Sequence, residues 1–140
     1  MSDFNEQIIA EFRANGGTVT TAGFGDSLVL LHSTGARTGE ERITPLMSIP
    51  DDDGSRLIAG SKAGAPDNPA WVANLRAHPQ TVIEVGDGSA VSIVEVTAQL
   101  LEGVERDAAW ARFVARSPGF GAYQEKAGPR IIPVVRLNPR

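Results

Sequence analysis

The stretch that decides the fold is residues 27–50, which read SLVLLHSTGARTGEERITPLMSIP. Its first part, Ser27–His32, is a mostly apolar run typical of a strand, and its last part, Arg42–Pro50, alternates polar and apolar side chains. A glycine-bearing loop joins the two, and strands joined by short connections favour antiparallel pairing. Because Pro45 lacks an amide hydrogen, we expect the second strand at a sheet edge or at a bulge.

Further short strands are predicted on both sides of this stretch. Thr81–Val85 and Ala90–Val96 flank a Gly-Asp-Gly turn and form a predicted hairpin. Three more strands are expected at Thr18–Ala22, Arg56–Gly60 and Ile131–Leu137. Seven short strands in a chain of 140 residues indicate a barrel closed on itself.

Three helices complete the predicted fold. An amphipathic helix is expected over about residues 3–15, where apolar side chains recur at helical spacing before a Gly-Gly stop. Two more are expected over Ala70–Ala77, which follows an Asn-Pro start, and over Glu102–Arg116. We therefore predict a single α+β domain over residues 1–140, a mostly antiparallel barrel of six to seven strands with flanking helices.

Composition excludes several classes of function. The chain has no cysteine, so thiolate nucleophiles, disulfides and iron–sulfur clusters are excluded, and His32 and His78 are too far apart for a helical zinc motif, so no metal site is predicted. A net charge of −4 without a block of basic residues disfavours nucleic-acid binding. No basic signal region or long apolar run is visible, so we expect a cytoplasmic protein, with peripheral membrane contact left open for the N-terminal helix.

Two glycine-bearing loops hold the best candidates for a binding site. Residues 33–42 combine two glycines, three hydroxyls and two arginines, which suit a phosphate or carboxylate. Residues 60–69 contain Lys62 and run into a helix start, and Trp71 follows where its ring could wall a planar ligand. Solvated turns and a core tryptophan are the alternative interpretation. Because acid–base residues are few, a cofactor is expected to supply the reactivity.

Several motifs then match a known family. They are residues 28–42 (LVLLHSTGARTGEER), 44–46 (TPL), 60–65 (GSKAGA), Asn68-Pro69, Trp71, Asn74-Leu75, Pro79, Phe120, Tyr123 and residues 130–135 (RIIPVV). From about residue 26 to its end, the sequence resembles the deazaflavin-dependent nitroreductases, actinobacterial oxidoreductases that use coenzyme F420. The resemblance implies a split β-barrel related to the FMN-binding oxidases.

The resemblance also implies roles for individual residues. Arg37, Thr38 and Arg42 would hold the phosphate and oligoglutamate tail of the coenzyme. The deazaflavin ring would be bound by Pro45, Leu46, Met47, Ser61, Lys62, Ala63, Gly64, Ala70, Trp71 and Asn74. Phe120 and Tyr123 would form the substrate wall, with Ser61 or Tyr123 as a proton donor beside solvent.

The implied reaction is hydride transfer from reduced F420 to an electron-poor small molecule. Activated enones and lactones of coumarin-like or aflatoxin-like shape are expected acceptors, or nitro compounds. Relatives that reduce nitroimidazoles well carry tyrosines where this chain has Ser117 and Phe120, which favours enone reduction. The alternatives are an FMN-binding oxidoreductase and a non-catalytic cofactor- or lipid-binding protein on the same barrel. Either a monomer or a homodimer is compatible with the sequence.

Overall fold

A computed structural model describes residues 3–21, 24–51, 53–60, 64, 68–117, 119–128 and 130–140. The helices are α1 (Asp3–Ala14), α2 (Ala70–Ala77), α3 (Gly103–Arg116) and α4 (Gly119–Ala127). The strands are β1 (Leu28–Thr34), β2 (Glu41–Met47), β3 (Ile49–Pro50), β4 (Arg56–Ala59), β5 (Gln80–Gly86), β6 (Val91–Leu100) and β7 (Val134–Pro139). Among the described residues, no helix is long and apolar enough to cross a membrane.

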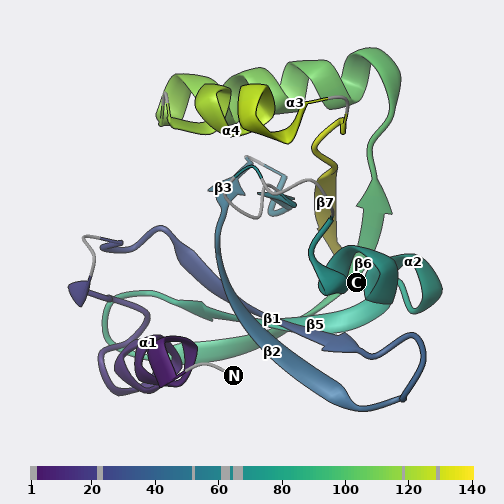
Figure 1. The fold of residues 1–140 in the computed structure, drawn as a ribbon. Helices are drawn as coiled ribbons and strands as arrows, with labels where there is room; N and C mark the ends of the chain where they lie inside the picture. Colours follow the sequence, from purple (N-terminus) through teal and green to yellow (C-terminus); the bar gives the residue numbers. More distant parts are fainter. Residues whose placement is uncertain are drawn as a thin grey trace.

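The seven strands form one antiparallel sheet in the order β2-β1-β5-β6-β7-β4-β3. The two strands at the ends of this order are consecutive in sequence and are separated by Ser48 alone. One bent segment therefore forms both edges, and the sheet curls into a split barrel (Figure 1). Pro45 lies on the edge strand β2, opposite Leu30, which confirms its predicted position.

Three apolar clusters fill the spaces between these elements. The inside of the barrel is closed by β-strand side chains and by Trp71, Val72 and Leu75 of α2. A second cluster lies under α3 and α4, which Figure 1 shows together at one end of the molecule. The third cluster joins α1 to the outer face of β1, and its Phe12 is fully buried. Full burial of a large apolar side chain such as that of Phe12 stabilises the fold by about 1.5–3 kcal/mol relative to leaving it in water.

Most predicted elements are confirmed, including the hairpin of β5 and β6 and the helices over 70–77 and 102–116. The strand predicted at Thr18–Ala22 is wrong for its described residues, because only Val19 makes an isolated bridge, to Gly25. The Glu11 carboxylate accepts the Thr20 amide at 2.7 Å, so this amide is not available to a neighbouring strand. Ala22 lies outside the described residues.

Two further differences concern the C-terminal part of the chain. The last strand begins at Val134, three residues later than predicted. Helix α4 was not predicted at all, since its sequence GFGAYQEKA contains two glycines and few apolar residues. Tertiary packing stabilises it instead: the ring of Phe120 lies 5.4 Å from that of Phe113 and 5.8 Å from that of Trp110, both on α3.

Candidate functional site

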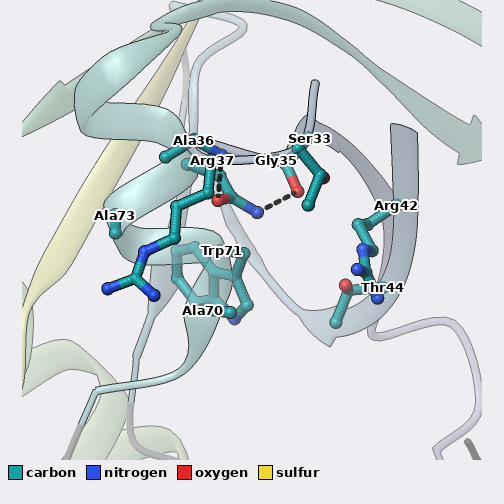
Figure 2. A pocket seen from close by; sticks show the side chains of 11 residues that line it. Ser33, Gly35, Ala36, Arg37, Arg42, Thr44, Ala70, Trp71 and Ala73 are labelled. Carbon is teal, nitrogen blue, oxygen red and sulfur yellow. Dashed lines mark hydrogen bonds between the residues drawn. The ribbon is translucent and has the colours of Figure 1, made fainter. Parts of the chain in front are cut away.

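A pocket of about 440 Å³ lies between the loop after β1, strand β2 and helix α2. We call it the arginine pocket. Its lining comprises Ser33, Gly35, Ala36, Arg37, Thr38, Arg42, Thr44, Ala70, Trp71, Ala73 and Asn74. In the view of Figure 2, Arg37 and Arg42 lie on opposite sides of Trp71. One cationic group therefore comes from the loop after β1 and the other from β2, and the aromatic wall comes from α2.

Asn74 fixes the position of this loop. Its Oδ1 accepts the Ala36 amide at 2.9 Å, and its Nδ2 donates to Ser33 Oγ at 3.3 Å, the two bonds drawn in Figure 2. Asn74 as a whole residue is 7% exposed, and Ser33 is 1% exposed. The loop is also closed internally by the Gly35 amide, which donates to Glu40 O at 2.8 Å. These bonds present the next residue, Arg37, in a defined place.

The two arginines of the pocket are weakly engaged by the protein itself. Arg42 Nη2 lies 3.8 Å from a Glu40 carboxylate oxygen, and both side chains are largely exposed. Within the described part of the chain, Arg37 makes no hydrogen bond or ion pair. Exposed ion pairs of this kind contribute little, so both guanidinium groups are available to an anionic ligand.

A second, larger space of about 580 Å³ adjoins the first; we call it the apolar cavity. Its lining comprises Phe4, Asn5, Ile8, Phe24, Leu28, Thr44, Pro45, Leu46, Met47, Ala59, Pro69, Trp71, Phe113, Phe120 and Tyr123. Thr44 and Trp71 line both spaces. A molecule with an anionic tail and a planar ring could therefore place its tail in one space and its ring at the border of the other.

Tyr123 faces the apolar cavity from α4. Its ring packs edge-on against Phe120, with ring centroids 5.5 Å apart and planes at 84°. Phe120 in turn packs against α3, so the position of the tyrosine is fixed by aromatic contacts. Among the described residues, no hydrogen-bond partner of the Tyr123 hydroxyl is present. The hydroxyl is thus free to donate to a molecule in the cavity.

The structure brings most predicted site residues together in these two spaces. Arg37, Thr38, Arg42, Ala70 and Asn74 line the arginine pocket, and Trp71 lines both spaces. The apolar cavity collects Pro45, Leu46, Met47, Phe120 and Tyr123.

The remaining predicted residues belong to the loop before α2. Ser61, Lys62 and Ala63 lie outside the described residues. Gly64 is buried at φ +80°, and a Cβ there would come within 2.8 Å of Tyr123 O. Gly64 therefore packs on α4 and is not in the lining of either space.

Sequence reasoning missed the part of the apolar cavity that α1 forms. Phe4, Asn5 and Ile8 line it, although they are distant in sequence from every predicted site residue. The helical spacing of Phe4 and Ile8 predicted an apolar face but not what that face covers. Thr44 was also missed as a residue shared by the two spaces; it lay inside the quoted TPL motif.

A charge cluster lies where the other end of α1 meets the sheet, and we call it the Glu84 cluster. The Glu84 carboxylate accepts bonds from Arg13 Nε at 2.9 Å and Nη2 at 2.6 Å, and His32 Nε2 lies 2.7 Å away. The other ring nitrogen of His32 lies 3.0 Å from Glu41. Because carboxylates only accept, the imidazole donates from both nitrogens and is cationic.

The pKa values in the Glu84 cluster agree with this geometry. The bond from Arg13 and that from His32 lower the pKa of Glu84, against the opposing effect of burial. Burial lowers the pKa of His32, but the carboxylates of Glu41 and Glu84 outweigh it, so the pKa of His32 is raised above 6.5. The cluster is therefore most favourable when both carboxylates are ionised and the ring is protonated.

The fold and the two adjoining spaces define a class: a split barrel in which a pocket with two arginines adjoins an apolar cavity. The family model of the F420H(2)-dependent quinone reductases matches residues 5–139, and the chain belongs to this family. The resemblance to F420-dependent reductases noted in the sequence is thereby confirmed.

Individual relatives agree with this assignment. The F420H(2)-dependent quinone reductase Rv1261c of Mycobacterium tuberculosis is 47% identical over 58 residues, which are 41% of this chain and 38% of that protein. The match thus spans well under half the length of that relative. The solved structure of an F420-H2 dependent reductase, FDR-A, has a TM-score of 0.69 at 34% identity, covering 80% of this chain and 94% of the other. A structure described as a domain-swapped dimer has a TM-score of 0.72 at 31% identity, covering 95% and 93%.

Proposed function

We propose that the chain transfers a hydride from reduced coenzyme F420 to planar, electron-poor carbonyl compounds. Quinones are the first acceptors to consider, because the family is described as F420H(2)-dependent quinone reductases. Activated enones and lactones of coumarin-like or aflatoxin-like shape share the conjugated carbonyl and come next. One observation carries the proposal: the arginine pocket and the apolar cavity meet at Thr44 and Trp71, so a tailed cofactor and an apolar acceptor can lie in contact.

The residues present fit the coenzyme. Two guanidinium groups with weak or no partners among the described residues suit a tail that carries several negative charges, one from phosphate and more from glutamates. Arg37, Thr38 and Arg42 would hold this tail, while Trp71 and Leu46 would pack against the ring. We further propose that Ser61, Lys62 and Ala63 contribute contacts from the loop before α2, as the resemblance implies.

When bound, reduced F420 supplies the hydride for the reaction. The protein orients the acceptor: Phe120 and Tyr123 line the apolar cavity and restrict how a flat molecule lies there. Conversion of a quinone to a hydroquinone takes one hydride and one proton. The Tyr123 hydroxyl, or solvent, gives this proton to the carbonyl oxygen, and solvent reprotonates the tyrosine.

Other acceptors and assemblies are less supported. Nitro compounds are disfavoured because Tyr123 is the only tyrosine in the chain and Phe120 occupies the neighbouring part of the cavity wall. FMN carries a single phosphate, which suits two arginines less well than a long tail with several anionic groups does. The relative described as a domain-swapped dimer supports a homodimer over a monomer.

The test is steady-state reduction of a panel of acceptors by the purified protein with F420H2. The panel contains a naphthoquinone, a coumarin-like lactone and a nitroimidazole. Turnover of the quinone or the lactone, at rates well above that of the nitroimidazole, supports the proposal. Tight F420 binding without turnover of any acceptor would instead indicate a cofactor carrier.

A further inference from the structure

Helix α1 forms part of the wall of the apolar cavity. Phe4 and Ile8 line the cavity from this helix, and Phe4 remains 48% exposed at its rim. Ile8 and Phe12 are buried against Leu28 and Leu30 of β1. Of the α1 residues whose side chains the structure describes, 4–14, none lines the arginine pocket. The position of α1 therefore bears on the acceptor side of the site and not on the tail of the coenzyme.

The opposite end of this helix is held by charge. Arg13 lies nine residues after Phe4, about 13 Å along the helix axis. Its guanidinium binds both oxygens of Glu84, whose side chain is 7% exposed. The elements around Glu84 each place one residue near its carboxylate. Arg13 comes from α1 and His32 from β1, and both contact Glu84 directly. Glu41 of β2 contacts His32, and the apolar Ile93 of β6 lies opposite Glu84 in the sheet.

A buried carboxylate in this place requires its partners. If Arg13 is removed, Glu84 keeps only His32, and a largely buried charge loses much of its compensation. The position of α1 on the sheet therefore depends on the charges of the Glu84 cluster, which are those of Arg13, His32, Glu41 and Glu84. Ile8 and Phe12 alone would hold the helix on the sheet without fixing its orientation so narrowly, because apolar contact is not directional.

We propose that Glu84 is a positioning residue for the acceptor: it orients α1 through Arg13, and α1 in turn selects the acceptor through Phe4 and Ile8. This proposal rests on the proposed function, because it concerns the acceptor of that reaction. Glu84 touches neither the arginine pocket nor the apolar cavity, so its effect is transmitted by the helix. Flat acceptors with apolar substituents reaching toward Phe4 are those most dependent on the wall.

The test compares Arg13→Ala and Glu84→Gln with Glu6→Gln. Glu6 is an exposed residue of the same helix that lies in neither the cavity lining nor the Glu84 cluster, so it is the matched control. Three quantities are measured: the Kd for F420, KM and kcat for a naphthoquinone at saturating F420H2, and hydrogen exchange of the amides of residues 3–14 without coenzyme. Because removal of Arg13 leaves the Glu84 carboxylate with His32 alone, the fold of each variant is checked by circular dichroism, and the double variant Arg13→Ala/Glu84→Gln, which removes both charges, replaces any single variant that does not fold.

We expect KM for the quinone to rise about tenfold in both cluster variants, with faster exchange over residues 3–14. The Kd for F420 and kcat should stay within about twofold of the unmodified protein. An unchanged KM despite faster exchange would overturn the proposal, as would an equal rise of KM and of the Kd for F420. If the unmodified protein does not bind F420, the proposed function has failed and the acceptor role fails with it.

The pH dependence supplies a readout that a purely structural role would not give. In the unmodified protein, KM should rise as the pH passes above the raised pKa of His32, because the bond between His32 and Glu84 then loses its ionic character. In His32→Gln this dependence should vanish. Persistence of the same pH profile in His32→Gln would overturn the link between the cluster and the acceptor.

Discussion

Replacing Asn74 by leucine should weaken F420 binding through the loop rather than through a lost contact with the coenzyme. Leucine has a similar volume but can neither accept the Ala36 amide nor donate to Ser33 Oγ. The loop that carries Arg37 then loses its bond to α2. A net hydrogen bond contributes about 0.5–1.5 kcal/mol, and about 1.4 kcal/mol is a tenfold change, so we expect the Kd for F420 to rise about two- to tenfold.

The same substitution should also lower the free energy of unfolding. Ser33 is 1% exposed, and its hydroxyl would be left without the Asn74 amide. An unpaired buried hydroxyl costs about 1–3 kcal/mol, which urea denaturation resolves. Asn74→Asp keeps the acceptor for Ala36 and serves as a second variant, but it places a negative charge in the arginine pocket.

The assay is a double-mutant cycle with two ligands. Asn74→Leu, Arg37→Ala and the double variant are titrated with F420 and with the deazaflavin chromophore that lacks the tail. Arg76→Ala, an exposed cation on the same helix, is the matched control. We expect Asn74→Leu to weaken only the tailed ligand, and to add little once Arg37 is absent. Equal weakening of both ligands, or full additivity with Arg37→Ala, would refute the reasoning.

Three other predictions follow from the site and its surroundings. Tyr123→Phe should lower kcat about 100-fold with the Kd for F420 unchanged if the hydroxyl donates the proton; an unchanged kcat assigns the proton to solvent. Gly35→Ala should weaken F420 binding, because its Cβ would meet the Thr38 hydroxyl at 2.6 Å; equal affinity would show that the loop adapts. The contribution of His32 to the free energy of unfolding should be complete below pH 6.5 and lost as the pH rises through its raised folded-state pKa, whereas that of Glu84 should be present above pH 4.5 and lost as the pH falls through its lowered one. Denaturation across this pH range in the protein, in His32→Gln and in Glu84→Gln checks both signs; a variant whose profile is identical to that of the unmodified protein would contradict the sign for the residue it replaces.

Local sequence patterns predicted the strands well where a single property of one residue or turn determines the structure. The turn of the β5–β6 hairpin and the edge position of Pro45 needed only sequence chemistry. Residues 18–21 have β-branched side chains, yet Glu11 of α1 accepts bonds from the Thr20 amide and from the hydroxyls of Thr20 and Thr21, contacts that no periodicity reveals. Helix α4 forms because Phe120 reaches aromatic residues of α3, which is a tertiary effect.

The candidate site, too, was predictable only where its residues lie close together in the sequence. The loop over residues 33–42 could be predicted as a binding site because its glycines, hydroxyls and arginines are concentrated in ten residues. The wall formed by α1 and the Glu84 cluster were not visible, since their members come from four elements spread over residues 4–84. The sequence excluded His32 from a helical zinc motif but assigned it no partner, and only the register of β1 with β2 and β5 brings two carboxylates to its ring. Peripheral membrane contact by α1 stays a prediction, and the burial of Ile8 and Phe12 leaves Phe4 as its main exposed apolar group.

The most direct test of the central claim is a fluorescence titration of the purified protein with oxidised F420, with FMN in parallel. We predict a micromolar or lower Kd for F420, weaker binding of FMN, and a marked loss of F420 affinity in Arg37→Ala but not in Arg76→Ala. Clear FMN binding without F420 binding would contradict the account, because the two arginines of the pocket would then not serve a polyanionic tail.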